Sequence, residues 1–395
     1  MRLILFVGAG VSKPSGLPLA AELTKRILEP SHADDEARER ERNLLNVIYE
    51  YDTHDIKRVG IYPDADGFKA SGSIYRAGGS TYEDLFFLCQ QISLWNIGLS
   101  DNSLTTPFME CIERKAGSLL RGPTVDARLC DLASLGRKAC SFIESVVAEE
   151  LDRAYSRGFD LLFELATAPE MEQLNIVTLN HDTLVEQFLS SNDVSFIDGF
   201  GERDGDVRWH DDSVYETAHS RVRLFKLHGS VDWYSFQYAG RARTATLLGR
   251  DPATAQDRAG KRLTAGPLTP SFLSGINKAL AYQRGIFADI HFRFGELLRQ
   301  CDRIVMSGYG WGDTVINFQL DTWLDRSRRN TIVLLHQGSQ QLRDASLIMA
   351  SGYDAWVRAG QLIPIEHWLS DLSLTDVRDH VYASPDLRYA RNPLR

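Results

Sequence analysis

The 395-residue sequence lacks a cysteine framework and any long apolar segment. Its five cysteines are an odd number without a C-x-x-C pair, which argues against a disulfide scaffold and a cysteine-based zinc site. No apolar run reaches the roughly 18–20 residues of a membrane helix. The first apolar run is also too short for a secretion signal. We therefore expect a cytoplasmic protein with free thiols, no membrane association and no bound metal.

Basic residues are fewer than acidic ones. Lys and Arg total 44 against 53 Asp and Glu, so the formal net charge is −9. Affinity for nucleic acids comes mostly from phosphate neutralisation by Lys and Arg, so direct binding of nucleic acid is not expected. A hydrophobic fraction of 43% and a charged fraction of 25% are typical of globular proteins. The length predicts two or three folding units.

Short apolar runs alternate with helical patterns over much of the chain. The runs cover residues 3–7, 175–179, 223–227, 303–306 and 331–335. Strands that alternate with helices predict an α/β fold, a doubly wound and mainly parallel Rossmann-like sheet. The region between the first two runs instead has apolar residues three and four apart, which predicts helices.

These patterns predict how the chain is divided. The predicted parts are a discontinuous sheet domain (1–30 and 169–338), a large helical insertion (31–168) and a C-terminal helical extension (339–395). Residues 64–81 are rich in Gly and Ser and are expected to form a loop. Residues 239–266 hold six basic residues against two acidic ones, and we expect a flexible basic loop there. That loop is either simply solvated or a contact surface for an acidic partner or a nucleic acid.

Ligands of open parallel sheets bind beyond the carboxyl ends of the strands. Two glycine-rich turns are expected at that edge, Gly8–Ser12 and Ser307–Asp313. Glycines there let backbone amides approach a pyrophosphate, and the Ser12 hydroxyl could add a donor. The third glycine of the common dinucleotide fingerprint is absent, since position 13 is Lys. The alternative for each segment is a tight turn without a ligand.

Asn180 and His228 also follow predicted strands directly. A carboxamide can hold a water or a ribose hydroxyl without ionising. Asp182 could orient Asn180 or cap the next helix. A histidine can accept a proton near neutral pH, which suits a general base. The alternatives are a turn residue for Asn180 and a hydrogen-bonded core histidine for His228.

Together these segments resemble the motifs of sirtuins. G-A-G-V-S with S-G-L-P at residues 8–18 resembles their opening motif, T-L-N-H-D at 178–182 their T-x-N-x-D motif, and L-H-G-S at 227–230 their catalytic histidine segment. Ser307-Gly308-Tyr309-Gly310 stands where sirtuins carry a serine loop that contacts the dinucleotide. The L-H-G-S-x-D-W and S-G-Y-G-x-G-D forms are typical of a branch found in bacterial anti-phage defence. Its members are NAD⁺-consuming effectors, and some work with a ring-forming ATPase.

The resemblance implies that NAD⁺ is the substrate and that the bond between nicotinamide and ribose is cleaved. It implies that Asn180 holds the attacking water or a ribose hydroxyl, that His228 accepts a proton and that Asp182 fixes Asn180. The residues implied for the pyrophosphate and adenine ribose are Gly8, Ala9, Gly10, Ser12, Ser307, Gly308 and Tyr309. His336, at the end of the next strand, is expected under the adenosine.

Three departures from the sirtuin pattern weaken the case for protein deacylation. The four-cysteine zinc module is absent, Leu19-Ala20-Ala21 stands where Asp-Phe-Arg is usual, and no peptide groove is recognisable. The prediction is therefore an NAD⁺ glycohydrolase that forms a homo-oligomer. The alternatives are an NAD⁺-dependent protein deacylase and a non-catalytic sensor or assembly module that binds NAD⁺ or ADP-ribose.

Overall fold

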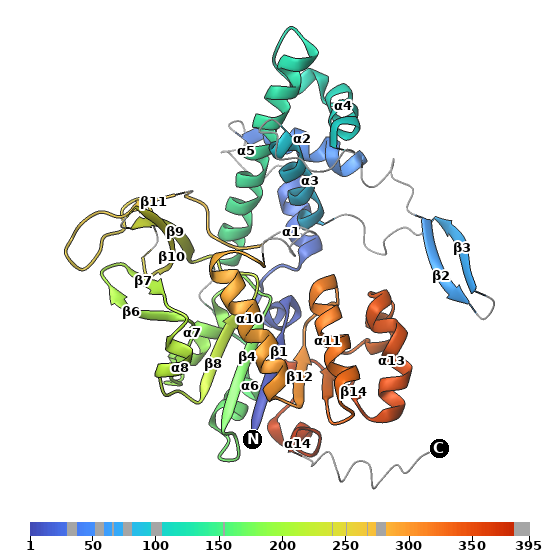
Figure 1. Cartoon of the computed structure of the whole chain (residues 1–395), viewed down its shortest axis with the longest axis vertical. Helices are drawn as coiled ribbons and strands as arrows, with labels where there is room; N and C mark the ends of the chain where they lie inside the picture. The colour runs from blue at the N-terminus through green and yellow to red at the C-terminus, as the bar shows by residue number, and fades with distance from the viewer. Residues whose placement is uncertain are drawn as a thin grey trace. The chain divides into compact units, whose positions relative to one another are not determined.

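The computed structural model describes residues 1–29, 38–51, 59–64, 67–73, 81–95, 105–152, 155–238, 240–249, 251–266, 268–273 and 282–382. The chain forms two compact units, and Figure 1 shows the elements of each. The first unit comprises Met1–Leu17, Leu151–Leu273 and Lys278–Arg395, and the second comprises Pro18–Glu150 and Ser274–Asn277. The insertion was predicted at 31–168. The second unit starts earlier because helix α1 (Ala20–Leu28) packs against α2 (Glu39–Glu50) and α3 (Tyr82–Trp95).

The first unit is built on a seven-stranded parallel sheet in the order β14-β13-β12-β1-β4-β8-β5. Its strands are β1 (Arg2–Val7), β4 (Gln173–Thr178), β5 (Phe196–Ile197), β8 (Val222–Lys226), β12 (Arg303–Ser307), β13 (Thr331–Leu335) and β14 (Leu362–Ile365). The inner strands are apolar and buried along nearly their whole length, as expected for a sheet covered on both faces. The predicted α/β fold with a parallel sheet is confirmed.

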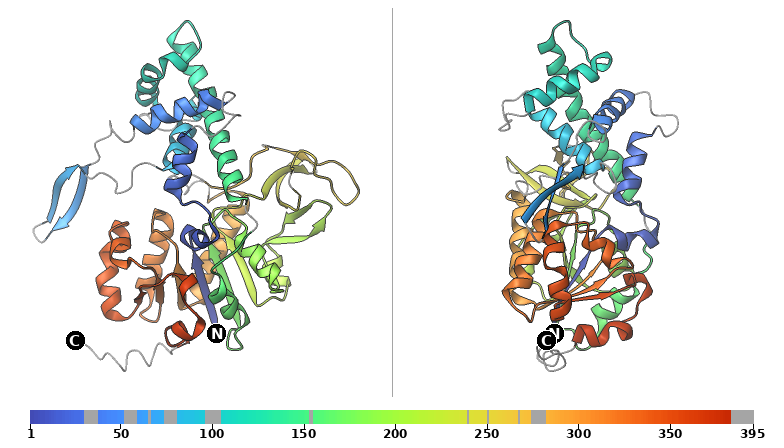
Figure 2. Two further views of the ribbon diagram at one scale, coloured as in Figure 1. Left: turned by 180° about the vertical axis from the view of Figure 1, so that it is seen from behind. Right: turned by 90° about the vertical axis from the view of Figure 1, so that its right-hand side faces the viewer.

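Helices on both faces of the sheet complete the first unit. They are η1 (Ala9–Ser15), α6 (Asp160–Thr167), α7 (Leu184–Ser191), α8 (Val214–Thr217), α10 (Gly285–Gln300), α11 (Thr314–Arg326), α12 (Ser339–Arg343), α13 (Leu347–Ala359), η5 (Leu369–Asp371) and α14 (Leu374–Tyr382). Helices α10, α11 and α13 bury apolar side chains against alternate residues of the central strands, such as Ile4 and Phe6. Helices α6 and α14 contact each other on the other side of the sheet (Figure 2).

The region predicted as a C-terminal helical extension also supplies a strand. Gly360 ends α13 in the left-handed conformation, and Leu362–Ile365 then pairs with β13 at the edge of the sheet. Pro364 lacks a backbone N–H and is tolerated because an edge strand has one unpaired side. Four residues are too few for a periodicity to indicate a strand in the sequence.

A smaller antiparallel sheet, in the order β11-β9-β10-β7-β6, also belongs to the first unit, and its strands come between strands of the main sheet along the chain. It consists of β6 (Phe200–Asp204), β7 (Val207–His210), β9 (Trp233–Tyr238), β10 (Arg241–Leu247) and β11 (Thr264–Ala265). The segment expected to be a flexible basic loop therefore contains two strands. The reason is burial: Ala245 and Leu247 pack against Trp209 and Phe236, while the arginines of β10 stay exposed.

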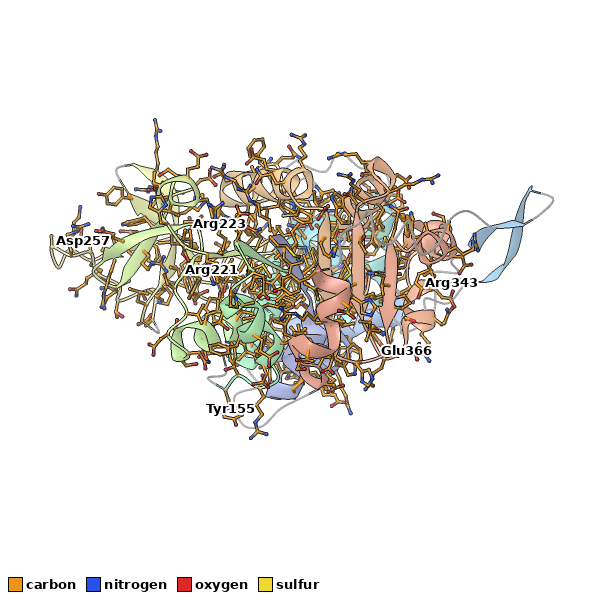
Figure 3. All side chains as sticks on the ribbon, turned by 90° about the horizontal axis from the view of Figure 1, so that it is seen from below. Tyr155, Arg221, Arg223, Asp257, Arg343 and Glu366 are labelled. Carbon is orange, nitrogen blue, oxygen red and sulfur yellow. The ribbon has the colours of Figure 1, made fainter. Side chains whose placement is uncertain are left out.

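The amino ends of the main strands, seen from below in Figure 3, hold structural contacts rather than the predicted site residues. Arg221 donates to the carbonyl of Ala168 at 3.3 Å. Arg303 donates to the carbonyl of Val381 at 2.6 Å and so ties α14 to β12. The sequence-predicted site residues lie at the opposite, carboxyl ends.

The second unit is mainly helical, as expected for the insertion. Besides α1, α2 and α3 it contains α4 (Thr105–Lys115), η4 (Gly117–Leu119), α5 (Val125–Leu151) and a hairpin of β2 (Val59–Asp64) and β3 (Gly67–Ser73). The prediction of a loop over 64–81 is wrong for Gly67–Ser73, which form β3: the Gly and Ser residues there belong to a strand whose backbone pairs with β2. Among the described helices, none combines the length and apolarity that crossing a membrane requires.

Candidate active site

The two glycine-rich turns touch each other. The amide of Gly8 donates to the carbonyl of Ser307 at 3.0 Å, and that of Gly10 donates to the carbonyl of Gly308 at 2.9 Å. Gly308 has a φ of +68°, and a Cβ built on it would lie 2.5 Å from the backbone nitrogen of Val11. Only glycine allows this approach. The amides of Gly8 and Gly10 are therefore engaged by the fold, and their predicted contact with a pyrophosphate stays a prediction.

Asn180 is fixed beside the first turn. Its Nδ2 donates to the carbonyl of Gly8 at 3.2 Å and to Oγ of Ser12 at 3.0 Å, and the residue is 7% exposed. Its Oδ1 is buried and meets no hydrogen-bond donor among the described residues. An unsatisfied buried acceptor costs about 1–3 kcal/mol, so this oxygen is suited to a donor from a ligand or a water.

Asp182 combines the two roles that the sequence left open. Its Oδ2 accepts from Oγ of Ser12 at 2.8 Å, so Ser12 links the carboxylate to Asn180. Its Oδ1 accepts from the amide of Leu184 at 3.1 Å, at the start of α7. One carboxylate thus holds both the helix start and, through Ser12, the amide of Asn180.

His228 lies in a buried polar cluster with Tyr282 and Asp313. Its Nε2 is 3.0 Å from the Tyr282 hydroxyl and 3.2 Å from Oδ2 of Asp313. The tyrosine hydroxyl in turn donates to the same Oδ2 at 2.7 Å. Sequence reasoning did not select Tyr282 or Asp313. A signal existed for Asp313, which ends a glycine-rich turn directly before a helix; Tyr282 stands in no motif.

Two further histidines surround His228. His291 bonds the carbonyl of Leu227 through Nε2 at 3.1 Å, and its ring stacks on Tyr282 with centroids 3.7 Å apart. Burial, with the nearby His228, lowers the pKa of His291 to about 4. His291 is therefore neutral at physiological pH. The second histidine, His181, has its ring centroid 6.2 Å from that of His228.

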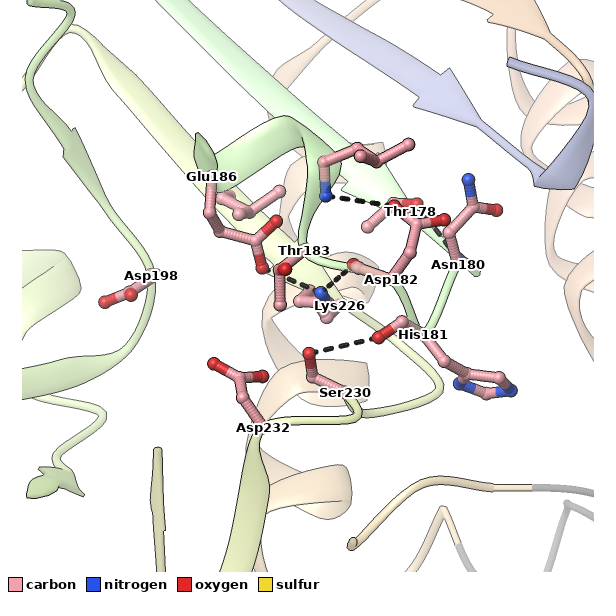
Figure 4. Close-up of polar contacts among 12 residues, drawn as sticks. Thr178, Asn180, His181, Asp182, Thr183, Glu186, Asp198, Lys226, Ser230 and Asp232 are labelled. Atoms are coloured by element: carbon pink, nitrogen blue, oxygen red, sulfur yellow. Dashed lines mark hydrogen bonds and ion pairs between the residues drawn. The ribbon is translucent and has the colours of Figure 1, made fainter. Parts of the chain in front are cut away.

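The loops that carry Asn180 and His228 are tied together (Figure 4). Nζ of buried Lys226 donates to the carbonyl of Asp182 at 2.5 Å and to Oε1 of Glu186 at 2.7 Å. The Ser230 hydroxyl donates to the carbonyl of His181 at 3.2 Å. Burial raises the pKa of Glu186 to about 7, although the charge of Lys226 acts to lower it. The pKa of Lys226 is also raised: burial acts to lower it, but the nearby carboxylates, Glu186 first, outweigh that effect. The segments 180–182 and 226–230 thus form one rigid edge.

The remaining predicted residues make internal contacts. The Ser307 hydroxyl donates to the carbonyl of Leu335 at 3.1 Å and accepts from the amide of Leu369 at 3.3 Å. The Tyr309 hydroxyl donates to Oδ1 of Asn317 at 2.8 Å. His336 accepts from the amide of Gly338 at 2.9 Å, which leaves its other ring nitrogen for further contacts. A role of these side chains toward a dinucleotide stays a prediction.

Among the described residues, no three or more His, Cys, Asp and Glu side chains come together in a way that could hold a metal ion. The polar groups that the site offers are an amide, an imidazole, carboxylates and hydroxyls. These groups can hold a neutral nucleophile and accept a proton.

Residues 174–355 match the family model of the SIR2-like domain. Over this range the chain is similar to the SIR2-like domain. The range includes Asn180, Asp182, His228 and the second glycine-rich turn, whereas Gly8–Ser12 lies outside it. No curated protein matches the chain.

Similar solved structures include three Sir2 homologue complexes, each 11% identical to this chain. One is a mutant with 2′-O-acetyl ADP ribose (TM-score 0.39; 100% of this chain and 94% of that chain covered). The second is a mutant with ADP ribose (TM-score 0.35; 89% and 93%). The third is a complex with NAD (TM-score 0.36; 94% and 85%).

Proposed function

We propose that the protein is an NAD⁺ glycohydrolase that cleaves the nicotinamide–ribose bond to release nicotinamide and ADP-ribose. The observation that carries the proposal is the buried Oδ1 of Asn180, which meets no donor among the described residues. It belongs to the SIR2-like range of the chain, and its loop is hydrogen-bonded to the loop of His228. An acceptor of this kind suits a water or a ribose hydroxyl.

The chemistry needs little beyond positioning and a proton acceptor. The bond from the ribose carbon to the pyridinium nitrogen breaks, and its electron pair neutralises the departing nicotinamide. The transition state resembles an oxocarbenium ion, as in other glycosyl cleavages. Water then forms the new C–O bond and loses one proton.

Asn180 and His228 divide this work. Oδ1 of Asn180 accepts a hydrogen bond from the attacking water or from a ribose hydroxyl, and His228 accepts the proton. A positioned base is worth about 10²–10⁴ in rate. Ser12 and Asp182 hold the amide of Asn180 in place.

The contacts to the rest of the dinucleotide are part of the proposal. The two touching turns, with Ala9 and Gly308, would bind the pyrophosphate and the adenine ribose. His336 would lie under the adenosine; its ring packs against that of Trp368 in a T-shaped arrangement, with the ring centroids 4.6 Å apart.

Chromatography of the products after incubation with NAD⁺ tests this function. We expect nicotinamide and ADP-ribose from the wild type and a loss of at least about 100-fold in Asn180→Ala and His228→Ala. The matched controls are Asn192→Ala and His219→Ala, since both side chains are exposed. Unchanged turnover in both site variants would remove the assignment.

The biological setting is the finer part of the proposal. The L-H-G-S-x-D-W and S-G-Y-G-x-G-D forms support an NAD⁺-depleting effector of bacterial anti-phage defence. We propose that it acts in the cytoplasm as a homo-oligomer, with a ring-forming ATPase as its partner protein. Native mass measurement, alone and with such an ATPase, tests the assembly.

A further inference from the structure

We infer that Asp313 and Tyr282 are positioning residues that hold His228 with its hydrogen on Nε2 and therefore make Nδ1 the proton-accepting nitrogen. The inference rests on the proposed function for its kinetic consequences. Its structural core, the tautomer of His228, does not depend on turnover.

Asp313 is itself held rigidly by its own helix. It is the N-cap of α11, and its Oδ1 accepts from the amides of Val315 and Ile316, each at 3.0 Å. Its Oδ2 faces the other way, toward the Tyr282 hydroxyl and Nε2 of His228. Because the capping oxygen is fixed by backbone, the second oxygen has little freedom to turn away from the imidazole.

The donors and acceptors around Nε2 decide where the hydrogen lies. An ionised carboxylate only accepts hydrogen bonds. The Tyr282 hydroxyl has one proton and directs it to Asp313, so it offers a lone pair to His228. Both of these groups present an acceptor to Nε2, so a neutral imidazole has its hydrogen on Nε2 and its lone pair on Nδ1.

The same arrangement stabilises the charge that develops during turnover. When Nδ1 accepts a proton, the imidazolium gains a positive charge 3.2 Å from the Asp313 carboxylate. This is the logic of the aspartate in a serine protease triad, which orients a histidine and stabilises its charged form. Among the described residues, the titratable rings that contact this cluster include His291, which is neutral, His181 and Tyr282.

Packing on Tyr282 supports the positioning role. Its ring lies nearly parallel to that of His291 at 3.7 Å, and the residue is 4% exposed. A stacked, buried tyrosine has few rotamers available, so its hydroxyl stays between the carboxylate and the imidazole.

The first test reads the tautomer directly. In ¹⁵N-histidine-labelled protein, the His228 signals are assigned as those missing from His228→Ala. We expect the Nε2–H pattern in the wild type. In Asp313→Asn the amide oxygen still caps α11, but an NH₂ group now faces Nε2, so we expect the pattern to switch to Nδ1–H. The same Nε2–H pattern in wild type and variant would overturn the inference.

The second test reads catalysis. We expect Asp313→Asn to lower kcat by about 100-fold or more and to move the acidic limb of the pH profile toward lower pH. Tyr282→Phe keeps the Asp313–His228 contact, so its loss should be smaller, about tenfold. The control Tyr215→Phe removes another buried hydroxyl, whose partner is the carbonyl of Leu224.

Combining Asp313→Asn with His228→Ala distinguishes positioning from general damage. If Asp313 acts through the imidazole, the double variant is no slower than His228→Ala alone. An additive loss, or an unshifted pH profile in Asp313→Asn, contradicts the inference. If the wild type does not cleave NAD⁺, the proposed function fails, and the tautomer measurement alone decides the inference.

Discussion

Oγ of Ser12 donates a hydrogen bond of 2.8 Å to Oδ2 of Asp182, across 170 positions of sequence. The same oxygen accepts from Nδ2 of Asn180 at 3.0 Å. A hydroxyl has one proton, and Ser12 donates it to the carboxylate of Asp182. Toward Asn180, Oγ of Ser12 can therefore only accept a hydrogen bond, which requires the NH₂ group of the amide on that side. Asn180 must then present its oxygen, not its nitrogen, on the other side. The orientation of the proposed catalytic amide is thus set by Ser12 and, through it, by Asp182.

Ser12→Ala tests this relay. Without the hydroxyl, the amide of Asn180 loses one acceptor and can rotate. We expect kcat for NAD⁺ cleavage to fall by about 10- to 100-fold while KM changes little, because the loss lies in positioning. Steady-state kinetics measure both constants.

The control for Ser12→Ala is Ser15→Ala, since the Ser15 hydroxyl lies in the same η1 segment and bonds the backbone of Arg157. A rise in KM at constant kcat would contradict the relay. It would show instead that the Ser12 hydroxyl binds the dinucleotide, the role that the sequence pattern predicts.

Positions at strand ends were the most predictable part of the site. A strand that is buried on both faces is a continuous apolar run, so the residue that follows it can be read from the sequence. Asn180 and His228 were identified in this way, and parallel pairing of β4 with β8 brings the two strand ends to one edge. Ser12 was assigned to a ligand, however, because no pattern in the sequence indicates a partner 170 positions away.

Tyr282 and Asp313 show where sequence reasoning ends. Tyr282 contacts His228, which lies 54 positions before it, and Asp313, which lies 31 positions after it. No periodic pattern in the sequence indicates either contact. Strand β10 was missed for a similar reason. Its arginines dominate the composition, whereas the burial of Ala245 and Leu247 depends on Trp209 and Phe236 in other strands. Such contacts arise from packing that only the folded chain provides.

Lys226 is expected to contribute strongly to stability. In Lys226→Met the carbonyl of Asp182 and the carboxylate of Glu186 lose their shared donor inside the protein. Removing one partner of a buried ion pair costs about 3–5 kcal/mol. Urea denaturation of wild type and variant measures the difference.

The double variant Lys226→Met with Glu186→Leu separates the pair from the packing around it. Replacing both charges by apolar groups should recover a large part of the lost free energy, since no charge is left buried alone. Equal free energies of unfolding for Lys226→Met and the double variant would show that the unpaired Glu186 carboxylate is not the cause of the lost stability.

Gly308→Ala is expected to destabilise the contact between the two turns. The methyl group would meet the nitrogen of Val11 at 2.5 Å and the carbonyl oxygen of Gly8 at 2.8 Å, on a residue with φ of +68°. Backbone strain and the clash together should cost about 2–4 kcal/mol. Thermal or urea unfolding tests this.

The matched control for Gly308→Ala is Gly310→Ala in the same turn. A Cβ at Gly310 meets no described atom within 4 Å, so we expect a change within about 0.5 kcal/mol. Similar effects of the two substitutions would show that the turns do not require their close approach.

Stability is expected to fall on acidification through the buried His291. Burial lowers its pKa to about 4, from an ordinary value of 6.5 in the unfolded chain. Between these values the unfolded state binds more protons than the native state, so the free energy of unfolding rises with pH. The contribution is complete above about pH 6.5 and is lost as the pH falls through about 4. A shift of this size corresponds to roughly 3 kcal/mol.

His291→Gln isolates that contribution. Glutamine can still donate to the carbonyl of Leu227 but does not titrate, so the fall in stability between pH 6.5 and pH 4 should become shallower than in the wild type. Part of the slope remains, because burial also lowers the pKa of His210 and His336. Urea denaturation at several pH values measures both slopes, with His219→Gln as an exposed control. Parallel slopes for wild type and His291→Gln would mean that His291 protonates as easily in the native protein as in the unfolded chain.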